Sequence, residues 1–155
     1  MAYSCCVAER TMDDMAEALS SETGLVTVAT QRADGRPLLS VVNAGVMGHP
    51  TTGEAVVGFV VRGSSAKHRH LRARPAIAVS ARRGWQWVAV EGEAELIGPD
   101  DPYPGFEAAA LPRLLRDVFK VAGGTHDDWE EYDRVMAQER RTAVLVRPTR
   151  VFGPG

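Results

Sequence analysis

The chain has 155 residues, of which 45% are hydrophobic and 25% charged, and its 18 Lys and Arg against 20 Asp and Glu give a formal net charge of −2. This composition indicates one globular domain over 1–155, large enough to bury a core without disulfides or a structural metal. No apolar run approaches the roughly 20 residues of a membrane span, and no leader with a basic and then an apolar region is recognisable. We therefore expect a cytoplasmic protein that does not bind membranes.

The two cysteines, Cys5 and Cys6, are adjacent in the sequence. Neighbouring residues rarely reach disulfide geometry, and two thiols cannot form a zinc site without histidines around them. We interpret both as inert thiols, with a redox role as the alternative.

The first elements predicted are a helix and a hairpin. Thr11 is a suitable N-cap and carboxylates follow it, so the helical spacing of the next apolar residues predicts a short amphipathic helix over 12–21. A run rich in β-branched residues at 25–30 predicts a strand. The Asp34-Gly35 pair is typical of a tight hairpin turn, which leads into a second strand through 38–46.

The middle of the chain predicts three more strands around one helix. A nearly continuous apolar run at 55–61 is typical of a strand in a covered sheet. Ser64 is suited to cap a short helix that ends at Pro75, because the residue before a proline disfavours the helical region. Strands are then predicted over 76–81 and 86–97, with Arg82-Arg83-Gly84 as their turn.

The last third predicts two helices and a sixth strand. A proline-rich loop begins at Pro99, and a helix with one apolar face follows as far as Gly123-Gly124. Thr125 is the expected cap of another helix, whose acidic start and basic end suit the helix dipole, and 142–152 is the last strand. Six mostly antiparallel strands with marginal helices predict a mainly β fold, a small barrel rather than a doubly wound parallel sheet. Glycine-rich dinucleotide loops, Walker loops and nucleophile elbows are absent from the sequence.

Charge is unevenly distributed. The segment between Glu54 and Glu91 contains no acidic residue and seven basic ones: Arg62, Lys67, Arg69, Arg72, Arg74, Arg82 and Arg83. One interpretation is a solvated basic face. The other is a polyanion site, because hydroxyls, backbone N–H groups and cations converge where Arg62 ends a strand and Ser64, Ser65 and Lys67 begin a helix.

The chemistry of that polyanion separates two classes of protein. Nucleic-acid binding usually requires stacking aromatic residues or a recognition helix beside the basic surface, and the sequence signal for either is weak. A phosphorylated cofactor requires only a local anion site and an apolar wall for its ring, which this strand, helix and strand could supply. We therefore predict a cofactor rather than a nucleic acid.

The histidines and tryptophans allow alternative interpretations. His126, Asp127 and Asp128 are interpreted as helix-capping residues rather than metal ligands, and His68 and His70 do not share a helix face, so we predict no metal site. His49, in a loop, is interpreted as a surface residue, with a role as proton donor to a substrate as the alternative. Trp85 and Trp87 alternate with Gln86 and point to one side of a strand, either into the core or against a cofactor.

The order and spacing of several segments resemble a known family. These segments are the Asp34-Gly35-Arg36-Pro37 hairpin, Arg62-Gly63-Ser64-Ser65-Ala66-Lys67, the helix end Leu71-Arg72-Ala73-Arg74-Pro75, the strand Val88-Ala89-Val90-Glu91-Gly92-Glu93-Ala94, and Arg147-Pro148-Thr149-Arg150-Val151. From about Met12 to Phe152 the chain resembles the pyridoxamine 5′-phosphate oxidase-like split-barrel superfamily, and within it the actinobacterial group that uses the deazaflavin coenzyme F420.

The resemblance implies an FMN-binding split barrel-like fold and a homodimer with two flavin-like cofactors in grooves between the subunits. It implies that Arg62, Ser64, Ser65 and Lys67 hold the cofactor phosphate. The ring would lie along Val41, Val42 and Asn43, and Trp85 and Trp87 would reach it from the partner subunit. Ala66 stands where the oxidase itself has an arginine, which argues against FMN and against pyridoxamine phosphate oxidation.

F420 carries a phosphodiester and an oligoglutamate tail, so the broad basic segment suits it better than FMN. The activity implied is hydride transfer from reduced F420 to an electron-poor small-molecule acceptor, with the cofactor supplying the chemistry. His49 is the candidate proton donor in that reaction. The alternatives are an FMN-binding oxidoreductase and a non-catalytic flavin-binding protein of the same fold.

Overall fold

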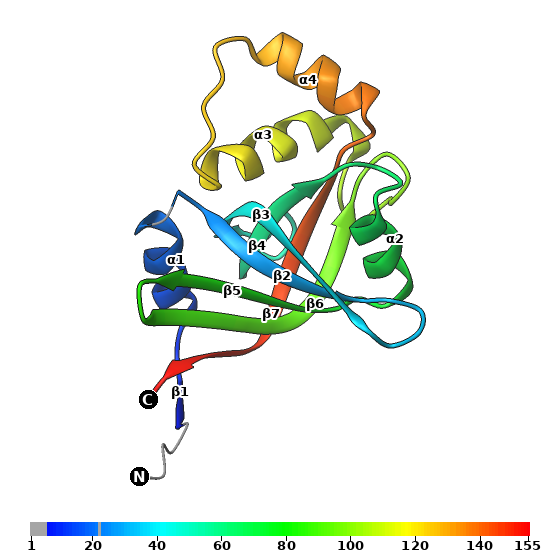
Figure 1. Cartoon of the computed structure of the whole chain (residues 1–155). Coiled ribbons are helices and arrows are strands. Elements are labelled where there is room, and N and C mark those ends of the chain that lie inside the picture. Colours follow the sequence, from blue (N-terminus) through cyan, green and yellow to red (C-terminus); the bar gives the residue numbers. More distant parts are fainter. Residues whose placement is uncertain (1–5, 22) are drawn as a thin grey trace.

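The computed structural model describes residues 6–21 and 23–155 (Figure 1). The interpretation of Cys5 as an inert thiol therefore lies outside the described residues, whereas Cys6 is exposed. Within the part described, no helix combines the length and the apolar character needed to span a membrane.

Strands contain more of the described residues than helices do. The elements in chain order are β1 (Val7–Glu9), α1 (Met12–Ser21), β2 (Leu25–Gln31), β3 (Pro37–Gly48), β4 (Ala55–Val61), α2 (Ala66–Ala73), β5 (Ala76–Arg83), β6 (Gln86–Ile97), the 3-10 helix η1 (Ala108–Ala110), α3 (Leu111–Val121), α4 (Trp129–Gln138) and β7 (Thr142–Pro154). The predicted elements are all present, with strand ends that differ by a few residues.

The strands form a closed antiparallel barrel. Their order is β1-β7-β4-β3-β2-β5-β6, and pairing between β6 and β7 closes the six strands β2 to β7 into the barrel. β1 adds a seventh strand outside it, through Val7 opposite Pro154. The predicted split-barrel class is confirmed, but the count of six strands missed β1, which is too short for an alternating pattern to be visible.

The β2–β3 hairpin forms where the sequence indicated. Arg32 N–H donates to the Arg36 carbonyl at 2.9 Å, and Gly35 adopts φ +84°, a conformation that favours glycine. The Asp34 carboxylate accepts from Arg36 Nε at 2.9 Å, and these hydrogen bonds lower the pKa of Asp34. The hairpin therefore aligns β3 along β2 over seven residue pairs, from Leu25–Asn43 to Gln31–Pro37.

Two apolar clusters hold the fold together. The first fills the barrel and is closed by Met15 and Leu19 of α1 and by Leu71 of α2, all nearly inaccessible to solvent. The second lies between the outer side of the barrel and the α3 and α4 pair, which sits together over one end of the barrel (Figure 1). Arg116 Nε of α3 donates to Asp133 Oδ1 of α4 at 2.8 Å, so the two helices are also joined by an ion pair.

Three local predictions were wrong. Ser65, not Ser64, caps α2, and Asp128, not Thr125, caps α4 by accepting from the N–H groups of Glu130 and Glu131. Ser64 has φ +62°, whereas an N-cap residue needs the extended backbone that Ser65 has. The β5–β6 turn consists of Gly84 and Trp85, because β5 continues through Arg82 and Arg83.

Candidate functional site

The barrel opens between β3 and β4. These strands pair from Gly48–Ala55 as far as Ala44–Phe59. Beyond that point β3 continues along β2, while β4 continues along β7 to Val61–Thr142. Residues 40–43 of β3 and residues 60–63, at the end of β4 and just beyond it, therefore have no ladder between them. We call this region the split.

One side of the split is the turn from β4 into α2. Arg62 and Ser64 are exposed there, and Ser65 and Lys67 are half-buried in the first turn of the helix. The first N–H groups of a helix lack intrahelical partners and carry the positive end of its dipole, so this turn presents donors and cations together. The ion pairs of the described residues do not include Lys67, and Arg62 lies 3.6 Å from its carboxylate partner Glu139. We call residues 62–67 the anion turn.

The other side of the split is β3. Val41 is 62% exposed and Asn43 is exposed, while Val42 is half-buried. Asn43 Nδ2 donates to the Thr23 carbonyl at 3.1 Å. Lys67 Nζ donates to Ser40 Oγ at 3.0 Å and so joins the anion turn to β3. On the two sides of the split lie seven of the residues predicted to bind the cofactor: Val41, Val42 and Asn43 on β3, and Arg62, Ser64, Ser65 and Lys67 on the anion turn.

A cavity of about 560 Å³ continues from this strand to the α3–α4 pair. Val60, Phe119 and Met136 give it apolar walls, and Asn43 and Arg141 give it polar groups. Arg141 Nε donates to Glu139 Oε2 at 2.7 Å, and Glu139 also accepts from the Gly63 N–H through its backbone carbonyl. Glu139 therefore contacts both Arg141, which lines the cavity, and the anion turn. Sequence reasoning identified this segment only as a helix with one apolar face, and it missed Arg141.

Trp85 and Trp87 lie apart from the split of their own chain. Trp85 is 95% exposed in the β5–β6 turn, so its placement in the core is excluded. Trp87 is half-buried and packs edge-on against Phe152, with ring centroids 5.8 Å apart. The two indoles line an open hollow of about 550 Å³ together with Ser80, Arg82 and Gly84. They were predicted to act on the cofactor of a partner subunit, and their exposure leaves them accessible to one.

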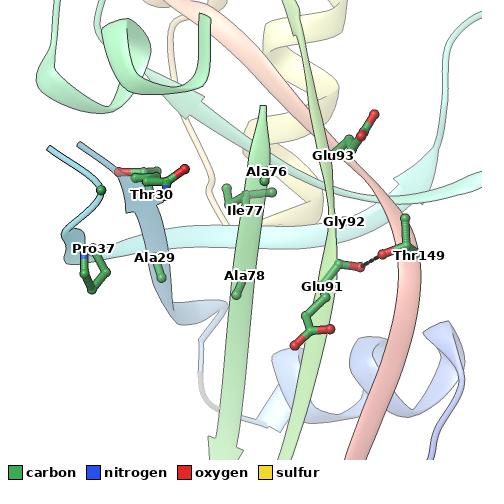
Figure 2. A pocket seen from close by; sticks show the side chains of 12 residues that line it. Ala29, Thr30, Pro37, Ala76, Ile77, Ala78, Glu91, Gly92, Glu93 and Thr149 are labelled. Atoms are coloured by element: carbon green, nitrogen blue, oxygen red, sulfur yellow. Dashed lines mark hydrogen bonds between the residues drawn. The ribbon is translucent and has the colours of Figure 1, made fainter. Parts of the chain in front are cut away.

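The outer face of β2, β3 and β5 is apolar and open. Leu25, Leu39 and Val41 are each at least half-exposed on this face, and Val41 pairs with Thr27, which pairs in turn with Ser80. A hollow of about 530 Å³ adjoins this face. Figure 2 shows its lining, which includes Ala29 and Ala78 and the β6 carboxylates Glu91 and Glu93. The face and the hollow form one continuous surface across the barrel.

His49 is buried, contrary to its interpretation as a surface residue. It is only 4% exposed, and its Nδ1 accepts from the Thr51 N–H at 3.2 Å. Its Nε2 lies 2.9 Å from Glu95 Oε2, outside hydrogen-bond geometry, and its ring packs against Tyr103 with centroids 5.3 Å apart. Burial and the nearby Glu95 raise the pKa of Tyr103. His49 follows the end of β3 and is six residues from Asn43, about 20 Å in an extended chain, so one chain does not bring it to the split.

The other histidines have local roles. His126 Nδ1 accepts from the Asp128 N–H at 3.0 Å at the start of α4, in agreement with the capping interpretation. His70 Nδ1 lies 3.0 Å from Thr30 Oγ1, whereas His68 is buried against Asp101, so the two side chains point to different partners as predicted. In the described residues no group of three or more His, Cys, Asp or Glu side chains has the arrangement of a metal site.

Comparisons with known proteins agree with this architecture. The family model described as pyridoxamine 5′-phosphate oxidase matches residues 12–152. A conserved hypothetical protein from Mycobacterium tuberculosis superposes with a TM-score of 0.64 at 20% identity, over 94% of this chain and 84% of its own. An F420 reductase gives a TM-score of 0.60 at 21% identity, over 87% of this chain and 94% of its own. An FMN-binding protein related to pyridoxamine 5′-phosphate oxidase, from Nostoc punctiforme, gives a TM-score of 0.62 at 16% identity, over 90% of this chain and 79% of its own.

Proposed function

Because the chain belongs to the pyridoxamine 5′-phosphate oxidase family, we propose that it is an oxidoreductase that uses reduced F420 to reduce an electron-poor small-molecule acceptor. The observation that carries this proposal is the split, where a turn rich in cations, hydroxyls and helix N-terminal N–H groups lies beside an exposed apolar strand. The likeness to an F420 reductase and to an FMN-binding protein supports a flavin-type cofactor in this fold.

The residues of the split suit a phosphorylated ring cofactor. The hydroxyls of Ser64 and Ser65 and the ammonium of Lys67 would bind the phosphate, with Arg62 as a second cation. Val41 and Val42 would lie along the ring, and the Asn43 oxygen is an acceptor for a ring N–H. When bound, F420 would supply the hydride, so the protein has to orient the ring and exclude water.

The choice of F420 over FMN rests on charge. Arg69 and Arg74 continue the basic surface of the anion turn along α2 and beyond its end, whereas Arg72 is paired with Asp101. A phosphodiester followed by an oligoglutamate tail would place several carboxylates beside these cations, whereas FMN ends at one phosphate. Ala66 also lacks the cation that the oxidase has at this position.

A second copy of the chain would complete the site. We propose a homodimer through the apolar outer face of Leu25, Leu39 and Val41, since soluble monomers seldom expose a contiguous apolar surface without a partner. Val41 lies both on this face and on the split, so the cofactor groove would run along the dimer interface. Trp85 and Trp87, at the far edge of the same face, are the residues that each subunit would offer to the cofactor of the other.

The acceptor would enter the cavity beneath α3 and α4. Its walls at Val60, Phe119 and Met136 favour a planar apolar molecule, and Arg141 would bind a carbonyl or carboxylate on it. The proposed activity is tested by mixing the protein with reduced F420 and a panel of quinones and conjugated enones, and following oxidation of the deazaflavin. Turnover that depends on the protein supports the reductase, and binding without turnover would leave a cofactor carrier.

A further inference from the structure

A buried histidine contacts the backbone of the anion turn. His68 is 3% exposed in the first turn of α2, and its Nδ1 lies 3.3 Å from the backbone nitrogen of Ser64. Its Nε2 lies 2.6 Å from Asp101 Oδ2, on the loop after β6. His68 thus bridges two segments that are separated by more than thirty residues in the sequence.

Ser64 needs such support because of its backbone conformation. Its φ of +62° is in the left-handed region, which costs a non-glycine residue roughly 1–2 kcal/mol. Both backbone polar groups of Ser64 are hydrogen-bonded. The N–H donates to His68 Nδ1, and the carbonyl accepts from the guanidinium of Arg69. A strained residue at a ligand site persists only where its surroundings determine it.

The contacts determine which nitrogen of His68 carries the proton. A backbone N–H can only donate, so Nδ1 must be the unprotonated nitrogen that accepts from Ser64. The proton then lies on Nε2 and is donated to Asp101, whose other oxygen accepts from Arg72 Nε at 2.9 Å. The Ser64 N–H is therefore committed within the protein, and a bound anion would meet the hydroxyls and the next N–H groups of α2.

We infer that His68 and Asp101 are positioning residues for the anion site: Asp101 sets the tautomer of His68, and His68 holds Ser64 in the conformation that points its hydroxyl toward the ligand. This inference rests on the proposed function only in taking residues 62–67 as the phosphate site. Neither side chain contacts the ligand itself. Both act through the Ser64 peptide group.

Asp101→Asn tests the tautomer directly. Arg72 requires an acceptor, so the Asn oxygen would stay toward Arg72 and its amide would donate to His68 Nε2. The proton would then move to Nδ1, where it would face the Ser64 N–H, so that two donors meet and the hydrogen bond is lost. We expect nitrogen NMR to show protonation at Nε2 in the wild type and at Nδ1 in the variant, faster amide exchange at Ser64, and F420 affinity about tenfold weaker, the size of one lost hydrogen bond. Asp100→Asn, the same change one residue earlier, is the matched control and should alter none of these.

His68→Asn and His68→Gln separate the hydrogen bond from packing. The Asn oxygen lies near the position of Nδ1 and can accept from Ser64, whereas Gln reaches toward Asp101. We expect the Asn variant to bind F420 within about threefold of wild type and the Gln variant about tenfold more weakly, although both lower the melting temperature. Equal affinities in the two variants, or a wild-type His68 protonated at Nδ1, would overturn the inference.

The experiments distinguish a failure of the proposed function from a failure of the inference about His68 and Asp101. If the wild type binds neither F420 nor FMN, that function is wrong, and inorganic phosphate becomes the probe of the turn. Phosphate-dependent shifts of the Ser64 and Ser65 amides that disappear in Asp101→Asn would still support the inference. Shifts that persist unchanged in that variant, or that are absent from the wild type, would contradict it.

Discussion

Lys67 Nζ donates a hydrogen bond to Ser40 Oγ at 3.0 Å, and the two residues stand on opposite sides of the split between β4 and β3. The lysine is thereby held over the strand along which a ring would lie, rather than extended into solvent. Its partner is a neutral hydroxyl, so the positive charge remains available to an anion. This contact joins the anion turn and the apolar strand into one site.

Replacing Lys67 by Ala should weaken binding of the cofactor. The loss of one charge-assisted contact is worth about 1.5–3 kcal/mol, or roughly tenfold to a hundredfold in affinity. The change is measured by titrating the apoprotein with F420. Lys120→Ala is the control, because this lysine lies over the Trp129 ring at 4.9 Å and outside the split. Equal affinity of Lys67→Ala and wild type would remove the phosphate site from the anion turn.

Replacing Leu39 by Glu should dissociate the proposed dimer. Leu39 is 65% exposed on the apolar outer face, and a two-fold interface would bury the substituted residue twice. Loss of about 1.5 kcal/mol or more at each copy raises the dissociation constant by at least about a hundredfold. Light scattering after size exclusion gives the mass of each species. Val7→Glu, which changes an exposed valine of β1, should keep the wild-type mass, and an unchanged mass in Leu39→Glu would exclude this face as the interface.

Tyr132 should make the protein sensitive to alkali. Burial raises the pKa of Tyr132 to about 12, against about 10 for a tyrosine in the unfolded chain. The phenol is neutral in both states below pH 10, so its contribution to stability is complete there and is lost as the pH rises from about 10 toward 12. Tyr132→Phe should lose about 1 kcal/mol at neutral pH, because the hydroxyl donates to the Leu115 carbonyl at 3.2 Å.

Denaturant unfolding at several pH values measures this difference. The difference in free energy of unfolding between wild type and Tyr132→Phe should shrink and then change sign above pH 10. The reason is that unfolding lets the phenol of the wild type ionise at this pH, whereas the variant has no phenol at this position. A gap that stays constant up to pH 12 would mean that Tyr132 titrates normally in the folded protein.

His49→Ala should affect stability and spare the cofactor. The substitution removes a buried ring that packs on Tyr103 and is bonded to Thr51, which costs roughly 2–4 kcal/mol. F420 affinity and turnover should remain at the wild-type level, because His49 lies beyond the end of β3 that is remote from the split. His126→Ala, at an exposed helix start, should have a much smaller effect on thermal unfolding. Lost turnover in a folded His49→Ala protein would restore the proton-donor role considered from the sequence.

Local sequence signals predicted the barrel well. The Asp34-Gly35 turn and the apolar run at 55–61 depend on backbone conformation and burial of neighbouring residues, and both were confirmed. The residues predicted to bind the cofactor in the split lie on β3, in the turn that follows β4 and at the start of α2, so their placement depends on the order of these three elements along the chain. The resemblance to the family added the roles that spacing alone does not give.

The errors concern features that depend on distant partners. His49 is buried because Glu95 and Tyr103 come from segments more than forty residues away, which no local pattern records. Ser64 was mistaken for the cap because the left-handed conformation that excludes it is stabilised by His68, whose own orientation depends on Asp101. Arg141 was missed because it reaches the cavity only when β7 pairs with β4.

The most direct test of the central claim is a fluorescence titration of the purified apoprotein with F420 and, separately, with FMN at physiological salt. We predict that F420 binds at least about tenfold more tightly than FMN, because the basic surface along α2 has a tail to bind only in F420. Tighter binding of FMN, or binding of neither molecule, would contradict the assignment of this protein as an F420-dependent reductase.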